Sequence, residues 1–159
     1  MLALAIQDHP KKSKTLQNIE ERGEFVVNLP DMNLADKMVL ASFDTRLGEN
    51  KVDRSAFTRL PAERVSPCRL SECRAHLECS VRSILYPGDH GVILADILSA
   101  SYDEEAFLDN MLIDVRHYQP VIHLQNFQVK EVPAQLHIFL KSDCVDIREV
   151  PYPKSEGGL

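Results

Sequence analysis

The chain has 159 residues, of which 44% are hydrophobic and 26% charged, and its formal net charge is −6. These values are typical of one folded domain and exclude an intrinsically disordered chain, which would combine few apolar residues with a large charge excess. The net charge gives no overall attraction to nucleic acid or anionic lipid, and no apolar run approaches the ~18 residues that a membrane-spanning helix needs. We therefore predict a cytoplasmic protein with no nucleic-acid and no membrane partner, organised as one domain over residues 1–150 with a flexible tail over residues 151–159.

The four cysteines predict neither a disulfide framework nor a metal site. Their spacing fits no zinc pattern, and the short apolar start of the chain lacks the basic front of a signal peptide, so an oxidising compartment is not indicated. We expect no bound metal, and free thiols, mostly buried, at Cys68, Cys73, Cys79 and Cys144.

The first 30 residues predict a strand, a loop, a helix and a second strand. Residues 1–6 are an apolar run typical of a strand, and a polar loop follows. Either Ser13 or Thr15 can cap the helix that comes next, because a hydroxyl accepts hydrogen bonds from the first helix amides. The inward stripe expected for this helix is Leu16 and Ile19, with Glu20 as a further candidate. Gly23 should end the helix, and the β-branched and aromatic run before Pro30 predicts the second strand.

The start of this helix is also a candidate anion site. Hydroxyl and ammonium groups converge there with the first helix amides, which carry the positive end of the helix dipole. The residues concerned are Lys11, Lys12, Ser13, Lys14 and Thr15. A lysine-rich loop before a capped helix is equally typical of a simple solvated connection, so the spacing by itself leaves both interpretations open.

Two motifs in the same stretch resemble those of a known family. Residues 13–19 read SKTLQNI, close to a pattern Lys-Asp-Thr-Leu-x-Asn-Ile, and residues 23–28 read GEFVVN, identical to a second motif. Both belong to the flavin reductase-like, FMN-binding split-barrel family, which the chain resembles over residues 1–127. The resemblance implies that the loop residues Lys12, Ser13, Lys14 and Thr15 bind the FMN phosphate.

A second helix is expected over residues 32–43, with Asn33 as its cap. The apolar stripe expected for it is Leu34, Met38 and Leu40 or Ala41. The polar residues 44–50 follow as a loop, a region that borders the active site in the resembling family. Arg46 and Lys51 are therefore candidate contacts for a substrate or dinucleotide, with solvated charges as the simpler interpretation.

Residues 74–82 alternate between polar and apolar side chains, which predicts a strand with one solvated and one buried face. Cys79 belongs to the apolar set and should be a small core residue. The return strand, residues 92–100, alternates little, so we expect both of its faces to be covered. The turn between them contains Gly88-Asp89-His90, which matches the Gly-Asp-His of the resembling family. The resemblance makes His90 a candidate flavin-binding residue, and an exposed turn histidine is the alternative.

The C-terminal third predicts an acidic rim over residues 101–110 and a barrel strand over residues 120–127. Two further β runs, residues 136–140 and 144–147, could add a sheet edge or a dimer contact. At residues 124–127 the chain reads LQNF where the resembling family usually has a Gly-Gly pair followed by Tyr. Because glycine permits close approach of a ring or backbone, this replacement should remodel that side of the pocket.

The resemblance implies a mainly β fold, an FMN-binding split β-barrel of the Greek-key type with a few short flanking helices, that forms a homodimer. It implies noncovalent FMN, NAD(P)H as a co-substrate, and the activity of an NAD(P)H:flavin oxidoreductase acting on flavin or on a small-molecule substrate. It identifies no catalytic acid or base. The alternative is a noncatalytic, dimeric binding module with a degenerate flavin site. The family's first strands are absent before Met1, so either Met1 is an internal start of a longer protein or the chain is an N-terminally shortened member, and the absent strands favour the noncatalytic alternative.

Overall fold

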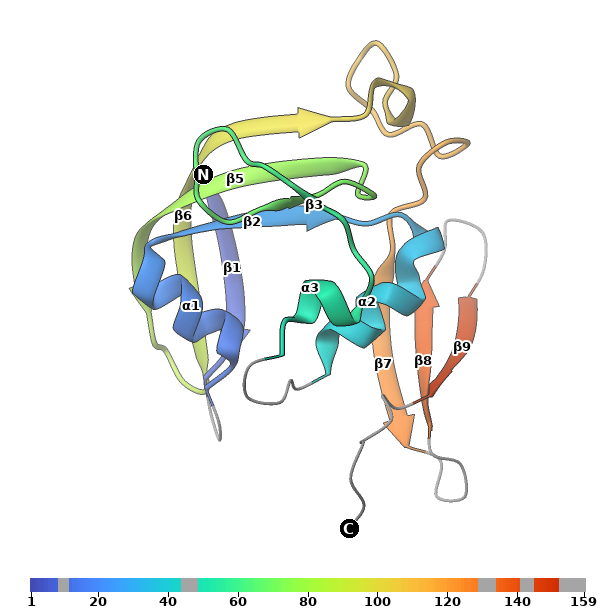
Figure 1. The fold of residues 1–159 in the computed structure, drawn as a ribbon, viewed down its shortest axis with the longest axis horizontal. Helices are drawn as coiled ribbons and strands as arrows, with labels where there is room; N and C mark the ends of the chain where they lie inside the picture. Colours follow the sequence, from blue (N-terminus) through green and yellow to red (C-terminus); the bar gives the residue numbers. More distant parts are fainter. Residues whose placement is uncertain (9–11, 44–48, 129–133, 141–144, 152–159) are drawn as a thin grey trace. The chain divides into compact units, whose positions relative to one another are not determined.

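The computed structural model describes residues 1–8, 12–43, 49–128, 134–140 and 145–151 of the chain (Figure 1). They divide into two compact units. Unit 1 comprises residues 1–28, 59–70 and 75–102, and unit 2 comprises the described residues among 29–58, 71–74 and 103–159. The single domain predicted over residues 1–150 stays a prediction, and residues 152–159 of the predicted tail lie outside the described part.

The elements are mainly strands, with a few short helices, as the sequence predicts. In chain order they are β1 (Leu2–Gln7), α1 (Lys14–Arg22), β2 (Glu24–Leu29), the 3₁₀ helix η1 (Met32–Leu34), α2 (Ala35–Ser42), α3 (Lys51–Arg54), β3 (Arg59–Leu60), β4 (Arg69–Leu70), β5 (Ala75–Leu85), β6 (His90–Tyr102), the 3₁₀ helix η2 (Glu104–Ala106), β7 (Ile122–Gln128), β8 (Ala134–Leu140) and β9 (Val145–Pro151).

Unit 1 is built on a four-stranded sheet in the order β1-β6-β5-β2. β5 and β6 form the long antiparallel hairpin that the sequence predicts, and β1 pairs antiparallel with the first half of β6, from Leu2 opposite Ala95 to Gln7 opposite His90. The pairing of β5 with β6 shifts register twice, between Glu78 and Cys79 and again after Val81. Such bulges add local twist, which is what a sheet needs to curl.

Helix α1 packs on this sheet through the residues that the sequence pattern assigns to its buried face. Ser13 caps the helix, with its Oγ accepting a hydrogen bond of 3.1 Å from the Leu16 amide. Gly23 ends it in the left-handed region at φ 71°, which suits a residue without a Cβ. Leu16 and Ile19 are buried in the unit 1 core with Phe25, Cys79, Ile93 and Ala95. The inclusion of Glu20 in the inward stripe is wrong, because Glu20 is an exposed residue whose carboxylate binds Lys12 and Tyr86 and not the core.

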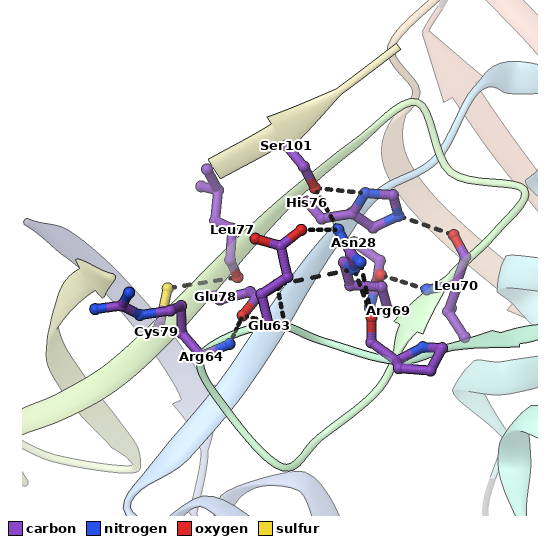
Figure 2. Close-up of polar contacts among 11 residues, drawn as sticks. Asn28, Glu63, Arg64, Arg69, Leu70, His76, Leu77, Glu78, Cys79 and Ser101 are labelled. Carbon is purple, nitrogen blue, oxygen red and sulfur yellow. Dashed lines mark hydrogen bonds and ion pairs between the residues drawn. The ribbon is translucent and has the colours of Figure 1, made fainter. Parts of the chain in front are cut away.

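In the polar set of β5, His76 and Glu78 are not solvated as predicted, because residues 61–70, here called the covering segment, lie over them, whereas Arg82 is exposed as predicted. His76 and Glu78 are 7% and 1% exposed. The Glu78 carboxylate accepts hydrogen bonds from the Glu63 amide at 3.0 and 3.1 Å and from the Arg64 amide at 2.6 Å (Figure 2). A buried carboxylate is stable only with such partners. Glu78 on β5 therefore holds the backbone of the covering segment, which is not part of a strand at Glu63 and Arg64.

Further hydrogen bonds hold the covering segment in place, some from side chains of the sheet and some from its own Arg69. Asn28 accepts a hydrogen bond from the Leu70 amide at 2.8 Å, and His76 lies 2.9 Å from the Leu70 carbonyl oxygen (Figure 2). Arg69 donates to the Pro61 carbonyl at 2.7 and 3.0 Å and to the Ser101 hydroxyl at 3.1 Å. Side chains thus form hydrogen bonds with backbone groups of this segment, such as those of Pro61 and Leu70, that a neighbouring strand would bind in a longer sheet.

The prediction that both faces of β6 are covered holds fully for only one face of its first half. Where β1 pairs with β6, Gly91, Ile93 and Ala95 are buried on one face, whereas Val92 and Leu94 on the other face are half-buried. Farther along the strand, Ile97 and Leu98 are 38% and 44% exposed. The reason is that the pairing with β1 ends at Ala95, so beyond it β6 has β5 as its only strand neighbour in the described sheet.

Unit 2 contains a three-stranded antiparallel sheet in the order β7-β8-β9, together with α2 and α3. The predicted strand near residues 120–127 and the two later β runs are confirmed as these three strands.

The helical stretch predicted over residues 32–43 is confirmed as η1 and α2. Its predicted cap is wrong, because Asp31 and not Asn33 is the capping residue: the Asp31 carboxylate accepts a hydrogen bond of 3.1 Å from the Asn33 amide. Its most buried residues, Ala35 and Val39, differ from the predicted stripe, and they pack with Met32 and Phe139.

The cysteines that the structure describes are free thiols, as predicted. Cys79 lies in the unit 1 core and Cys73 is buried in unit 2, whereas Cys68 is half-buried. Burial raises the pKa of the Cys79 thiol, and burial together with the Glu72 charge raises the pKa of Cys73 to about 11. These thiols are protonated at neutral pH and behave as small hydrophobic residues. Cys144 lies outside the described residues.

Glu78→Ala should lower the free energy of unfolding by about 2–4 kcal/mol, because the amides of Glu63 and Arg64 lose a buried acceptor. Urea titration followed by far-ultraviolet circular dichroism measures this. Glu63→Gln is the matched control, since the Glu63 side chain is 65% exposed. Equal urea midpoints for Glu78→Ala and the control would contradict the anchoring role.

Gly91→Ala should also destabilise unit 1, because its Cβ would lie 3.0 and 3.1 Å from the methyl groups of buried Leu16 and 3.3 Å from the Tyr86 ring. Overpacking of this size costs about 1 kcal/mol or more. The control is Gly88→Ala in the same turn, where a Cβ would meet nothing within 4 Å. The melting temperatures of the two variants should differ, and a Gly91→Ala protein as stable as the control would show that Leu16 can move aside.

Candidate functional site

The N-terminal end of α1 and the turn between β5 and β6 lie together in unit 1. Gln7, at the end of β1, is opposite His90, at the start of β6. One residue later the Asp8 amide donates a hydrogen bond of 2.8 Å to the Asp89 carbonyl. Leu16 packs against Gly91 from the helix side. The structure therefore brings the loop over residues 12–15 and the turn that carries His90 into one region, although Thr15 and His90 are 75 positions apart in the sequence.

The first turn of α1 presents groups suited to an anion. The amides of Lys14 and Thr15 are the first of the helix and have no intrahelical acceptor, while the Leu16 amide is capped by Ser13. The side chains of Lys14 and Thr15 are exposed, and within the described residues neither makes a hydrogen bond or ion pair. Lys11, the remaining member of the predicted anion site, lies outside the described part of the chain.

Lys12 is arranged differently from Lys14, since its ammonium group contacts other side chains. Its Nζ donates hydrogen bonds of 2.7 and 3.0 Å to the Glu20 carboxylate and lies 3.5 Å from the Asp8 carboxylate. It also lies over the Tyr86 ring, 5.5 Å from the ring centre. The same Glu20 carboxylate accepts a hydrogen bond from the Tyr86 hydroxyl. We call Asp8, Lys12, Glu20 and Tyr86 the Lys12 cluster.

The groups of the Lys12 cluster shift one another's pKa values. The hydrogen bond to Glu20 raises the pKa of Lys12, and the hydrogen bonds from Lys12 and Tyr86 lower the pKa of Glu20. The hydrogen bond to Glu20 also raises the pKa of the Tyr86 hydroxyl. At neutral pH Lys12 is therefore a cation between two carboxylates, and the cluster carries a net charge of −1.

His90 is a side chain on the exposed turn, with 47% of its surface accessible. Its Nδ1 lies 2.8 Å from the Asp89 Oδ1, and this hydrogen bond is the main cause of the lowered pKa of the Asp89 carboxyl. With Nδ1–H donating to Asp89, the Nε2 atom of the neutral ring can accept a hydrogen bond from a ligand. The orientation of the ring is thus set by its neighbour in the turn.

Sequence reasoning missed the partners of Lys12. The sequence pattern makes Glu20 a further candidate for the buried face of α1, whereas the structure pairs its carboxylate with Lys12 and Tyr86. Glu20 is eight positions after Lys12, which lies before the first helical residue Lys14, so helical spacing does not predict the pair. No sequence signal indicates Tyr86, because its contact depends on how β5 returns to α1.

The other candidate contacts are placed in unit 2 or outside the described residues. Lys51 is the first residue of α3, where the Asn50 side chain caps the helix by accepting a hydrogen bond of 2.9 Å from the Val52 amide. Arg46 lies outside the described residues.

Among the residues that the structure describes, no three His, Cys, Asp or Glu side chains are grouped to bind a metal ion. No helix in the described part is long and apolar enough to cross a membrane.

Comparisons with solved structures show the fold. The structure matches 2-nitrobenzoate 2-nitroreductase NbaA of Pseudomonas fluorescens with a TM-score of 0.68 at 22% identity, covering 98% of this chain and 72% of that one. It matches a Shewanella frigidimarina protein, provisionally described as a flavin reductase with a split barrel domain, with a TM-score of 0.65 at 12% identity, covering 96% and 70%. The predicted split-barrel fold is thereby confirmed.

Comparisons of sequence show the family. An uncharacterised protein of Archaeoglobus fulgidus is 32% identical over 109 residues, which are 69% of this chain and 59% of the relative. This chain therefore spans about three fifths of that relative. Residues 1–121, which include α1, the turn and β6, match the family described as flavin reductase like domain. The chain belongs to the flavin reductase-like domain family.

Proposed function

We propose that the protein binds FMN noncovalently and supports the transfer of a hydride from NAD(P)H to the flavin, or from the reduced flavin to a small-molecule acceptor. The observation that carries this proposal is the juxtaposition of the first turn of α1 with the His90 turn, inside the part of the chain that matches the family. FMN has a phosphate at one end and a planar ring at the other. The first turn of α1 suits the phosphate, and the His90 turn suits the ring.

The residues present fit the phosphate of such a ligand. The exposed first turn of α1 carries the Lys14 and Thr15 amides, which have no intrahelical acceptor, together with the Thr15 hydroxyl and the Lys14 ammonium group. Amides at a helix N-terminus and a nearby cation are the groups that bind phosphate in many proteins. Ser13 contributes by capping the helix, which fixes the direction of these amides. Lys12 would contribute charge at the edge of the site.

His90 would lie at the ring end of the ligand. Its Nε2 can accept a hydrogen bond from a ring N–H when the imidazole is neutral, or donate one to a ring oxygen when it is protonated. Asp89 holds the ring in place through Nδ1 in either case. When bound, the flavin supplies the hydride chemistry, and the protein supplies binding and orientation.

Lys14→Gln should weaken FMN binding about tenfold, because one charge-assisted hydrogen bond to the phosphate is worth roughly 1.5 kcal/mol. Riboflavin, which lacks the phosphate, should bind equally well to the variant and the wild type. Quenching of flavin fluorescence during titration with protein measures both affinities.

The control for this titration is Arg22→Gln, which removes a charge from the last turn of the same helix. A visible absorption spectrum of the wild type after addition of FMN and desalting comes first. If that protein retains no flavin and quenches no flavin fluorescence, the noncatalytic binding module is the better interpretation. If Lys14→Gln binds FMN as tightly as the wild type, the phosphate does not lie at α1.

We further propose that the protein forms a homodimer, and the exposed apolar half of β6 supports this. Ile97, Leu98 and Tyr102 are 38%, 44% and 45% exposed. A strand with large apolar side chains and one strand neighbour is a surface that tends to pair with another chain.

Leu98→Lys should shift the protein from dimer to monomer in light scattering coupled to size-exclusion chromatography, because a lysine at that position would have to lose its hydration. Leu85→Lys is the matched control, since Leu85 is 55% exposed near the other end of the hairpin. A monomeric wild type, or a dimer unaffected by Leu98→Lys, would exclude this surface as the interface.

A further inference from the structure

The ammonium group of Lys12 is directed along α1 and away from its N-terminal amides. Its hydrogen-bonding partner, Glu20, is six residues beyond the first helical residue Lys14. At 1.5 Å per residue this is a distance of about 9 Å along the helix axis. The backbone of Lys12, in contrast, is next to the capping residue Ser13, so the flexible side chain can reach either end of this stretch. The structure shows it paired with Glu20.

The contacts of Lys12 compete directly with a phosphate. The ammonium group has three donors, and the Glu20 oxygens occupy the positions at 2.7 and 3.0 Å, with the Asp8 carboxylate at 3.5 Å. The Tyr86 hydroxyl donates to the same Glu20 carboxylate and so fixes the position of that acceptor. With its ammonium group held by these carboxylates, Lys12 is not available to a phosphate at the first turn of α1 unless its pair with Glu20 breaks.

We propose that Glu20 is a positioning residue that competes with the flavin phosphate for Lys12 and so lowers the affinity of the protein for FMN without touching the flavin. This proposal rests on the proposed function. A phosphate dianion offers Lys12 more charge and more acceptor oxygens than Glu20 does, so binding draws the side chain from Glu20 to the phosphate. The energy needed to break the Lys12–Glu20 pair is subtracted from the affinity, which favours exchange of the flavin with solution over permanent retention.

The opposite arrangement would give Glu20 a supporting role. In that case the Lys12 cluster would only fasten the loop to α1 and to Tyr86, and breaking it would loosen both ends of the proposed site. The two arrangements predict opposite changes in FMN affinity when Glu20 is replaced. Competition predicts that loss of Glu20 tightens FMN binding, whereas fastening predicts that it weakens the binding of FMN and riboflavin alike.

The test compares Glu20→Gln with the wild type, with Glu21→Gln as the matched control, since Glu21 is the neighbouring exposed carboxylate on α1. Glu20→Gln should bind FMN about two- to fivefold more tightly, the range expected for an exposed ion pair, and riboflavin unchanged. In a Lys12→Gln background the same substitution should leave FMN affinity unchanged, because the residue for which Glu20 competes is absent. Flavin fluorescence titration at a fixed, low ionic strength gives all of these values.

A second measurement reports on Lys12 without flavin. Reductive methylation of the native protein, followed by mass spectrometry, should modify Lys12 more slowly than Lys14 in the wild type and in Glu21→Gln. In Glu20→Gln the rate at Lys12 should rise several-fold while the rate at Lys14 stays the same.

Weaker or unchanged FMN binding by Glu20→Gln would overturn the competition, as would tightening that persists in the Lys12→Gln background. Equal methylation of Lys12 and Lys14 in the wild type would show that Glu20 does not hold Lys12. Failure of the wild type and every variant to bind either flavin would instead overturn the proposed function and, with it, the competition. In that case the methylation rates would still report whether Glu20 restrains Lys12.

Discussion

The packing of Leu16 against Gly91 determines where the N-terminus of α1 lies in unit 1. Leu16 is fully buried, and a glycine at position 91 lets the helix approach β6 so closely that a Cβ there would lie 3.0 Å from a leucine methyl group. Because β6 begins at the same point, the helix N-terminus and the turn before β6 are held next to each other. Loop, helix and turn are joined further by the hydrogen bond from Asp8 to Asp89 and by the Lys12 cluster.

The second constraint on unit 1 is the need to pair the backbone of the covering segment. Between the two short strands β3 and β4 this segment makes few ladder bonds, and the sheet supplies acceptors from its own side chains instead. Glu78, Glu24 and Asn28 accept hydrogen bonds from four of its amides. Glu78 is buried and is stable there because its carboxylate has these partners, while Glu24 and Asn28 are half-buried.

The local charge of the candidate site differs from what a count of lysines suggests. Lys12 and Lys14 are close in sequence, but Lys12 contacts two carboxylates and Lys14 is exposed without a partner among the described residues. A motif rich in lysine therefore gives one available cation in the described loop. How much positive charge a ligand meets depends on which side chain pairs with Glu20, and such pairing is a property of the folded helix and turn.

The sequence by itself determined the local structure: Ser13 as the cap of α1, Gly23 as its end, Leu16 and Ile19 as its buried face, and the long β5–β6 hairpin. Each of these follows from periodicity or from the conformational preference of one residue, which operate over a few positions. The two motifs in residues 13–28 also identified the family. Only the tertiary structure decided that Glu78 and His76 are buried and that Tyr86 contacts both Lys12 and the Glu20 carboxylate. These depend on contacts between segments far apart in the chain, and no local pattern records which segment will cover a polar face or which carboxylate will reach a given lysine.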